Sequence, residues 1–169
     1  GDRGEFDKNV PHTSKALQRM INQISVYAKI GIHPSYGSYL NPKQLEKEIE
    51  RLNSITDNDV SLSRKHFLKL NIPETYRNLE KAGITNDYSM GYADNIGFRA
   101  SICTPYTFFD VLQNKSLNVK IHPFAYMDGT LNEYLGLSIA DAKGKVASLK
   151  QQVKEVGGIF IGIWHNETV

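Results

Sequence analysis

Apolar residues along the chain recur with two different periods, which predict helices and strands in turn. Within residues 14–28, Leu17, Met20 and Ile24 recur every three or four positions, as on one face of a helix. Residues 29–33 are instead a short apolar run, which predicts a buried strand. By the same criteria, helices are predicted over 14–28, 41–55, 72–84, 106–115 and, as one helix or two, within 131–158, and strands over 29–33, 60–70, 86–92, 96–103, 117–124 and 158–166.

Two of the predicted helices carry residues that mark their ends. Asn41 can cap a helix that has Pro42 at its first position, where a missing N–H costs nothing. Pro73 lies near the start of the next helix and Gly83 is placed to stop it. The alternation of strands and helices predicts an α/β fold with largely parallel strands, in a single domain over residues 1–169.

The two ends of the chain indicate an incomplete sheet. A loose polar stretch leads directly into a helix, and the last predicted element is the strand over 158–166. We therefore expect a parallel sheet curved toward a barrel that lacks its first strand, so that the chain is a fragment. Because an exposed sheet edge invites pairing, we expect a helix or a second copy of the chain to cover it.

Composition excludes several classes of protein. The chain has 169 residues, is 40% hydrophobic and 22% charged, and carries a net charge of +2 with no concentrated basic stripe, which argues against nucleic acid as a partner. No apolar run is long enough to span a membrane. The single cysteine, Cys103, lies in an apolar run and is interpreted as a small core residue. A cytoplasmic location fits this cysteine usage, and a periplasmic or envelope location stays open.

Histidines at or near the ends of predicted strands are the candidates for chemistry. His33 and His165 each end a strand, and His66 lies within one, two residues from Arg64. Because the carboxyl ends of parallel strands share one edge, we expect these histidines to lie in one cleft with Arg64 and Asp87. The alternative is that they are ordinary polar residues at strand ends. No H-x-x-x-H pair, G-x-S-x-G turn or phosphate-binding glycine loop is present.

Three stretches, taken in order, resemble the polysaccharide deacetylase family (carbohydrate esterase family four). "KIGIHPSYGSYLNPKQLEKEIERLNSI" is similar to its second motif, an apolar strand followed by H-[ST]-x-x-H and a helix. "SRKHFLKLNIPETYRNLEKAGITNDYSM" is similar to the next block, and "GIFIGIWHNET" to the closing motif. The resemblance covers residues 25–169 and is closest to a divergent branch associated with bacterial surface-polysaccharide genes. It implies a distorted (β/α) barrel.

The resemblance also implies an activity, the removal of acetyl groups from N-acetylated sugars with the help of a divalent metal such as zinc. His165 would be the general acid, Asp87 would raise the pKa of His165, and Arg64 would orient a catalytic aspartate. His33 would bind the metal, with His66 as a second ligand. Substrate contacts are expected from residue type at Arg99, Tyr36 and Trp164.

The chain departs from the family pattern in two places. The first motif, T-F-D-D-G, is absent and would lie before residue 1, and the second histidine of H-[ST]-x-x-H falls on Gly37. A fragment without these ligands is expected to bind metal poorly, or not at all. Two functions therefore stay open: a metal-dependent carbohydrate N-deacetylase, and a non-catalytic relative that binds carbohydrate or a protein partner.

Overall fold

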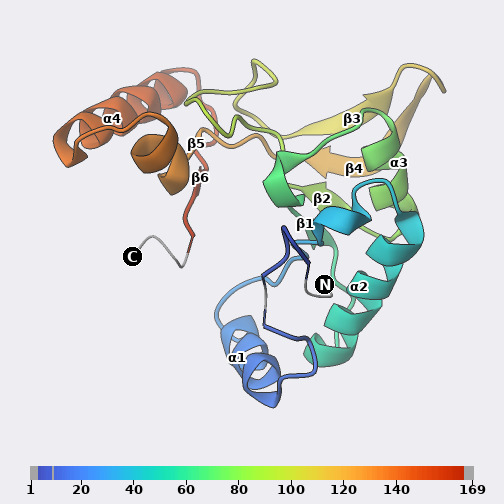
Figure 1. Ribbon diagram of the computed structural model, residues 1–169. Helices are drawn as coiled ribbons and strands as arrows, with labels where there is room; N and C mark the ends of the chain where they lie inside the picture. Colours follow the sequence, from blue (N-terminus) through green and yellow to red (C-terminus); the bar gives the residue numbers. More distant parts are fainter. Residues whose placement is uncertain (1–3, 9, 166–169) are drawn as a thin grey trace. The chain divides into compact units, whose positions relative to one another are not determined.

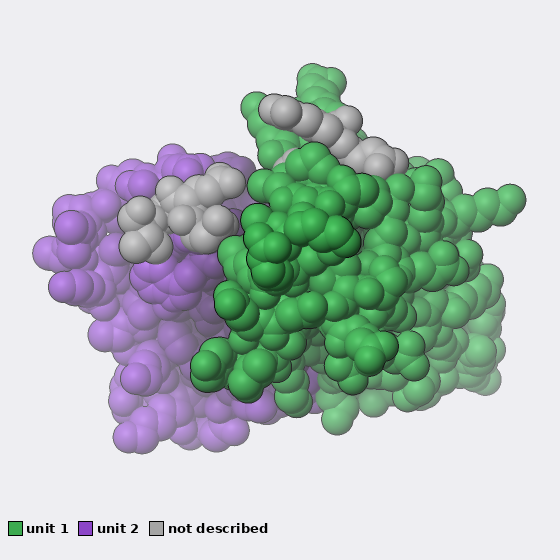
Figure 2. Space-filling model, turned by 90° about the horizontal axis from the view of Figure 1, so that it is seen from below, with its two compact units in different colours: residues 1–87, 107–120 green, residues 88–106, 121–169 purple. Residues whose placement is uncertain are grey.

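The computed structural model describes residues 4–8 and 10–165. The chain folds into two compact units, shown in Figures 1 and 2. Unit 1 comprises residues 1–87 and 107–120, and unit 2 comprises residues 88–106 and 121–169. The expected single domain stays a prediction, and each unit is described by itself below.

The helices of unit 1 begin and end at residues that the sequence marks. They are α1 (Lys15–Ser25), α2 (Pro42–Thr56) and α3 (Glu74–Lys81), with short 3₁₀ turns η1 (Tyr36–Ser38) and η2 (His66–Leu68). Asn41 caps α2 by accepting a hydrogen bond from the Gln44 amide at 3.1 Å, as predicted. The apolar faces of α2 and α3 bury their residues, whereas α1 has an apolar stripe whose side chains stay exposed or half-buried.

Unit 1 is built around a four-stranded sheet in the order β1-β2-β4-β3. Its strands are β1 (Leu62–Ser63), β2 (Asn86–Asp87), β3 (Tyr106–Asp110) and β4 (Lys115–Ile121). Strands β1 and β2 pair in parallel, and Ile32 forms a further parallel bridge with Ser63. In β4, Leu117, Val119 and Ile121 are buried while the residues between them are exposed, the alternation expected of a strand with one buried face.

The predicted helix over 106–115 is wrong, because these residues form β3 and a turn. Phe108 and Asp110 point inward and their neighbours outward. The buried Asp110 carboxylate accepts hydrogen bonds from Arg77 Nε at 2.5 Å and Nη2 at 3.0 Å. It also accepts from the amides of Leu112 and Gln113, which fixes the turn. A buried carboxylate interrupts the apolar pattern, so the strand period was not visible in the sequence.

Other predicted strands are shorter in the structure. The strand over 60–70 is only Leu62–Ser63, because the chain turns at η2, where Phe67 and Leu68 have φ values of 53° and 51°. The strand over 29–33 is reduced to the bridge at Ile32, and residues 96–103 form bends and turns instead of a strand.

Unit 2 packs helices against a two-stranded parallel sheet. Its elements are β5 (Tyr126–Met127), the π-helical turn η3 (Thr130–Tyr134), α4 (Ile139–Glu155) and β6 (Gly162–Ile163), so residues 131–158 contain two helical segments. Ala125, Tyr126 and Leu131 form the buried core, and the half-buried apolar residues that pack against it are Ile96, Phe98, Leu137, Ala142, Val146, Leu149 and Phe160.

The parallel pairs in both units confirm the predicted α/β class. The barrel form with a missing first strand stays a prediction. None of the helices in the described part of the chain has the length and apolar character needed to cross a membrane, as expected from the sequence.

Candidate functional site

Unit 1 brings together two of the predicted site residues, His33 and His66. His33 follows the bridge at Ile32, and His66 opens η2, three residues beyond the end of β1. Their rings are nearly perpendicular, with His33 Nε2 3.0 Å from His66 Nδ1. Parallel strands bring these residues together, since both lie just beyond the carboxyl ends of neighbouring segments.

Backbone carbonyls decide which ring nitrogens carry hydrogen. His33 Nδ1 lies 2.7 Å from the Arg64 carbonyl oxygen, and His66 Nε2 lies 2.9 Å from the Phe6 carbonyl oxygen. Carbonyl oxygens only accept, so each of these nitrogens donates. A neutral imidazole has one N–H, so in the neutral pair the two facing nitrogens both present lone pairs. Such a contact at 3.0 Å is favourable only when a proton or a metal ion lies between them.

Asp7 lies beside this histidine pair, and sequence reasoning missed it. The Asp7 side chain is 11% exposed, and its Oδ1 lies 3.8 Å from His66 Nε2. Both carboxylate oxygens accept from the Tyr36 amide, at 3.0 and 3.2 Å. The neighbouring Phe6 ring packs on Tyr36 and on Phe67, which anchors this segment against η1 and η2. The signal was an aromatic residue directly before an aspartate in "EFD", within a stretch interpreted as loose and polar.

Two imidazoles and one carboxylate are a donor set that zinc accepts in proteins. Within residues 4–8 and 10–165, no group of three or more His, Cys, Asp or Glu side chains already has the arrangement of a metal site. The donor types of Asp7, His33 and His66 are those that divalent cations bind, and Asp7 lies at Nε2 of His66, opposite the nitrogen that faces His33.

A buried polar network supports the loop that follows His33. Glu48 on α2 accepts from the Ser35 amide at 2.8 Å, from the Ser35 hydroxyl at 2.6 Å and from Gln44 Nε2 at 2.7 Å. Burial alone would raise the pKa of Glu48, but these hydrogen bonds to the charged carboxylate outweigh it and the pKa is lowered. Glu48 thus holds the loop through its ionised form.

Lys65 and Asp87 face the same buried region of unit 1. Lys65 is 3% exposed and donates from Nζ to the Ser38 hydroxyl at 3.2 Å. Burial lowers the pKa of Lys65 to about 8, against the attraction of Asp87 and Glu48. Asp87 ends β2 and is fully buried. We expected Asp87 to support a general acid, whereas in unit 1 its charge acts on Lys65.

The remaining predicted residues of unit 1 have structural contacts. Arg64 holds this loop region through its backbone: its amide donates to the Ile32 carbonyl at 3.0 Å, and its carbonyl accepts from His33. Tyr36 accepts from Lys69 Nζ at 2.6 Å, and that ammonium also lies 4.1 Å from the Tyr36 ring centroid. Tyr36 is half-buried, and Lys69 already contacts both its hydroxyl and its ring.

Unit 2 contains a second pair of side chains, His165 and Asp128. His165 Nδ1 lies 2.5 Å from Asp128 Oδ1, and the His165 amide donates to Asp128 Oδ2 at 2.6 Å. Asp128 is 4% exposed and the His165 side chain 48%, so a buried carboxylate orients a solvent-accessible imidazole. This bond assigns the hydrogen to Nδ1 and leaves Nε2 as the nitrogen that can exchange a proton with a substrate. Asp128 was not among the site residues predicted from the sequence.

The other predicted residues of unit 2 are exposed. Trp164 is 68% exposed, and its ring packs edge-on against Tyr126 with centroids 6.3 Å apart. Arg99 lies exposed in the bends that follow Phe98. His33, His66, Arg64 and Asp87 belong to unit 1 and His165 to unit 2, so their expected common cleft stays a prediction.

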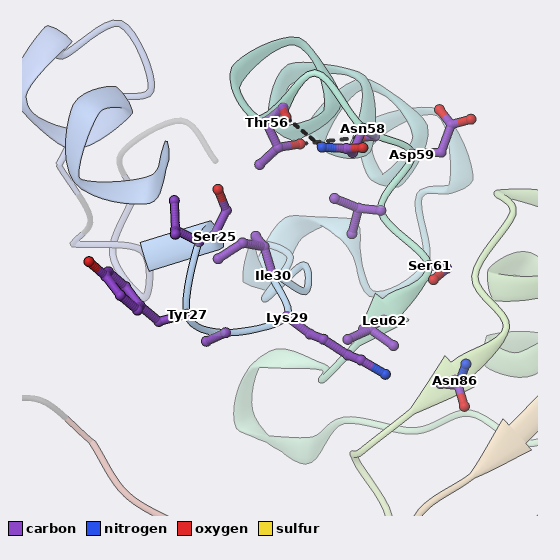
Figure 3. A pocket seen from close by; sticks show the side chains of 13 residues that line it. Ser25, Tyr27, Lys29, Ile30, Thr56, Asn58, Asp59, Ser61, Leu62 and Asn86 are labelled. Carbon is purple, nitrogen blue, oxygen red and sulfur yellow. Dashed lines mark hydrogen bonds between the residues drawn. The ribbon is translucent and has the colours of Figure 1, made fainter. Parts of the chain in front are cut away.

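A hollow of about 550 Å³ lies at the opposite end of the strands of unit 1 (Figure 3). It is lined by the first residues of two strands, Leu62 and Asn86, and by the segments after α1 and α2, with Lys29 and Asp59 as its charged residues. His33 and His66 instead follow the carboxyl ends of these segments. In (β/α) barrels the active site lies at the carboxyl ends of the strands, whereas residues at the amino ends contribute to stability.

Comparisons with known proteins agree with the fold. No family model and no curated protein sequence matches the chain. A solved structure described as "putative polysaccharide deacetylase from Mycobacterium smegmatis" is similar, with a TM-score of 0.62 over 90% of this chain and 16% sequence identity. The chain spans 55% of the length of that protein. The fold of this chain is therefore similar to the fold of that solved structure.

Proposed function

We propose that this chain is the metal-binding and acid–base part of a carbohydrate N-deacetylase, which hydrolyses the acetamide of an N-acetylated sugar in a surface polysaccharide. The observation that carries the proposal is the contact between His33 Nε2 and His66 Nδ1 at 3.0 Å; the carboxylate of Asp7 lies 3.8 Å from the other nitrogen of His66, Nε2. Facing lone pairs of two histidines are stabilised when a shared proton or a metal ion lies between them, and we propose the metal ion. The deacetylase-like fold is a second, independent support.

His33, His66 and Asp7 would hold the metal. A divalent ion bound there supplies a Lewis acid for the acetamide carbonyl and lowers the pKa of a bound water. The hydrogen bonds from the two imidazoles to the Arg64 and Phe6 carbonyls fix the ring orientations, as outer partners do for metal-bound histidines. The buried hydrogen bonds from Ser35 to Glu48 keep the His33 loop in place.

His165 would protonate the leaving amine through Nε2. Asp128 holds the ring by Nδ1 and stabilises the imidazolium, the arrangement by which a buried carboxylate supports an acid–base histidine. Amines are poor leaving groups unless protonated, so this proton transfer is required for hydrolysis. Arg64 keeps its proposed role of orienting a catalytic aspartate, Asp128 takes the place beside His165 that was expected for Asp87, and Arg99, Tyr36 and Trp164 keep their proposed contacts with the sugar.

The alternative is a deacetylase-like domain that binds carbohydrate or a protein partner without turnover. Its support is Gly37, which replaces the second histidine of the family motif. The position of His66 beside His33 weakens that argument, since a ligand from η2 can serve in place of one from the loop at Gly37.

Acetate release from an N-acetylated oligosaccharide tests the proposal. We expect activity that chelation removes and Zn²⁺ restores, and a loss of about 10²–10⁴-fold in kcat with little change in KM for His165→Ala. His122→Ala is the matched control, because His122 stacks on Tyr88 with centroids 4.5 Å apart and has no proposed role. No acetate release by the zinc-loaded protein would leave the non-catalytic alternative.

A further inference from the structure

A groove of about 730 Å³ runs along one face of α4 in unit 2. Its floor belongs to the core of the unit, with Leu131 and Leu137 on one side and Ala142 and Val146 from α4 on the other. The exposed Ile139 extends this apolar surface to the start of the helix. Most of the lining is hydrocarbon, so a ligand gains by burying an apolar group here.

Two lysines give the groove a positive edge. Lys143 and Lys150 both line it, and they lie seven residues apart on α4, on the same face and about 10 Å apart along the axis. Asp128 is the acidic residue among the described residues that line the groove, and its oxygens already accept from His165 and the Gly129 amide. The groove therefore offers two ammonium groups to a ligand and little competing negative charge.

One end of the groove reaches the proposed general acid. Trp164 and Asp128 line the groove, and they are the chain neighbour and the hydrogen-bond partner of His165. A ligand that lies along α4 thus ends beside this imidazole. The uncharged polar side chains in the described lining are Asn132 and the aromatic Tyr126 and Trp164, so the positively charged partners that the groove offers a ligand are the two lysines.

We infer that the substrate is an amphiphilic anion: a sugar joined to a hydrocarbon group through a phosphate or another acidic group, with the hydrocarbon on the groove floor and the acid against Lys143 and Lys150. This inference rests on the proposed function for the role of His165. The groove and its charge belong to unit 2 alone, so binding there can be measured without metal or turnover.

Trp164 is the single tryptophan of the chain, so its fluorescence reports directly on the groove. The probes are decyl phosphate, the neutral decyl glucoside and inorganic phosphate, each below the concentration at which the detergents form micelles. We expect saturable binding of decyl phosphate, at least about tenfold weaker binding of decyl glucoside, and no saturable response to phosphate alone. Decyl glucoside tests whether the hydrocarbon chain alone is sufficient for binding. Inorganic phosphate tests whether the anion alone is sufficient.

Charge variants on α4 test the role of the two lysines. The double variant Lys143→Gln with Lys150→Gln should weaken decyl phosphate at least about tenfold and leave decyl glucoside unchanged. The matched double variant Lys145→Gln with Lys154→Gln removes the same charge from residues of α4 outside the groove lining and should change neither.

Equal binding of the two detergents, equal losses in both double variants, or no saturable response to decyl phosphate would each overturn the inference. Saturation by inorganic phosphate alone would also overturn it, in favour of a simple anion site. Failure of acetate release with intact decyl phosphate binding would refute the proposed function and leave the groove assignment standing.

Discussion

His33 Nε2 lies 3.0 Å from His66 Nδ1, while the opposite nitrogen of each ring is occupied by a backbone carbonyl. The residues are 33 positions apart in the sequence and meet because their segments run parallel. With one N–H on each neutral ring, the two facing nitrogens carry lone pairs. Our central claim about unit 1 is therefore that His33 Nε2 and His66 Nδ1 share a cation.

Asp7→Asn tests the contribution of the carboxylate to zinc binding separately from that of the two imidazoles. The amide keeps the shape of the side chain and its bond from the Tyr36 amide, so the fold should be retained, but it removes the negative charge beside His66. We expect zinc affinity to fall by more than about tenfold, measured by competition with a chromogenic chelator. Glu5→Gln, at an exposed neighbouring position, is the control. Unchanged zinc affinity in Asp7→Asn would remove Asp7 from the site.

Asp128→Asn should impair catalysis more than folding. The variant keeps a hydrogen-bonding group near His165 but removes the negative charge that stabilises a positively charged ring, so kcat should fall by about 10²-fold or more with little change in KM. Asp87→Asn is the informative comparison, because Asp87 is buried and acts on Lys65 in unit 1. It should lower thermal stability. If Asp87→Asn lowered kcat as expected for Asp128→Asn, while Asp128→Asn had no effect, Asp87 would be the partner of His165 that the sequence predicted.

Stability should rise with pH in a window that Lys65 sets. Burial lowers its pKa in the folded protein to about 8, below the ordinary lysine value of 10.5. Between these values the unfolded state binds more protons, so the free energy of unfolding increases with pH, by at most about 1.4 kcal/mol per pH unit from this group. Below pH 8 the cost of the buried charge is present in full.

Urea unfolding between pH 7.5 and 10.5 measures this dependence. The difference between the wild type and Lys65→Met isolates the contribution of Lys65 from that of other lysines and tyrosines, and the exposed Lys47→Met serves as the control. A pH slope that is identical in the wild type and Lys65→Met would show that Lys65 is not the titrating group.

The sequence predicted those features that depend on local pattern. Asn41 with Pro42 marked the start of α2 and Gly83 the end of α3, because capping needs only neighbouring residues. The candidates His33 and His66 followed from their places at strand ends, and the structure brings them together.

Features that depend on distant partners were not predictable in this way. Strand β3 was mistaken for a helix because Asp110 is buried through Arg77, which is 33 residues away. Asp7 gave no periodic signal, and its place beside His66 depends on Phe6 packing against loops far along the chain. Asp128 was not predicted as a site residue because its partner, His165, follows 37 residues later.

Calorimetric titration of the metal-free chain with Zn²⁺ tests the central claim most directly. The absence of the first family motif led us to expect weak binding, whereas the cluster of Asp7, His33 and His66 predicts one zinc ion per chain. His33→Ala and His66→Ala should each weaken it by more than about 100-fold, since even the loss of an outer partner of a ligand costs about 10–100-fold. His12→Ala, a histidine of unit 1 outside the cluster, should bind like the wild type. No binding by the folded wild type, or stoichiometric binding that survives both His33→Ala and His66→Ala, would contradict the account.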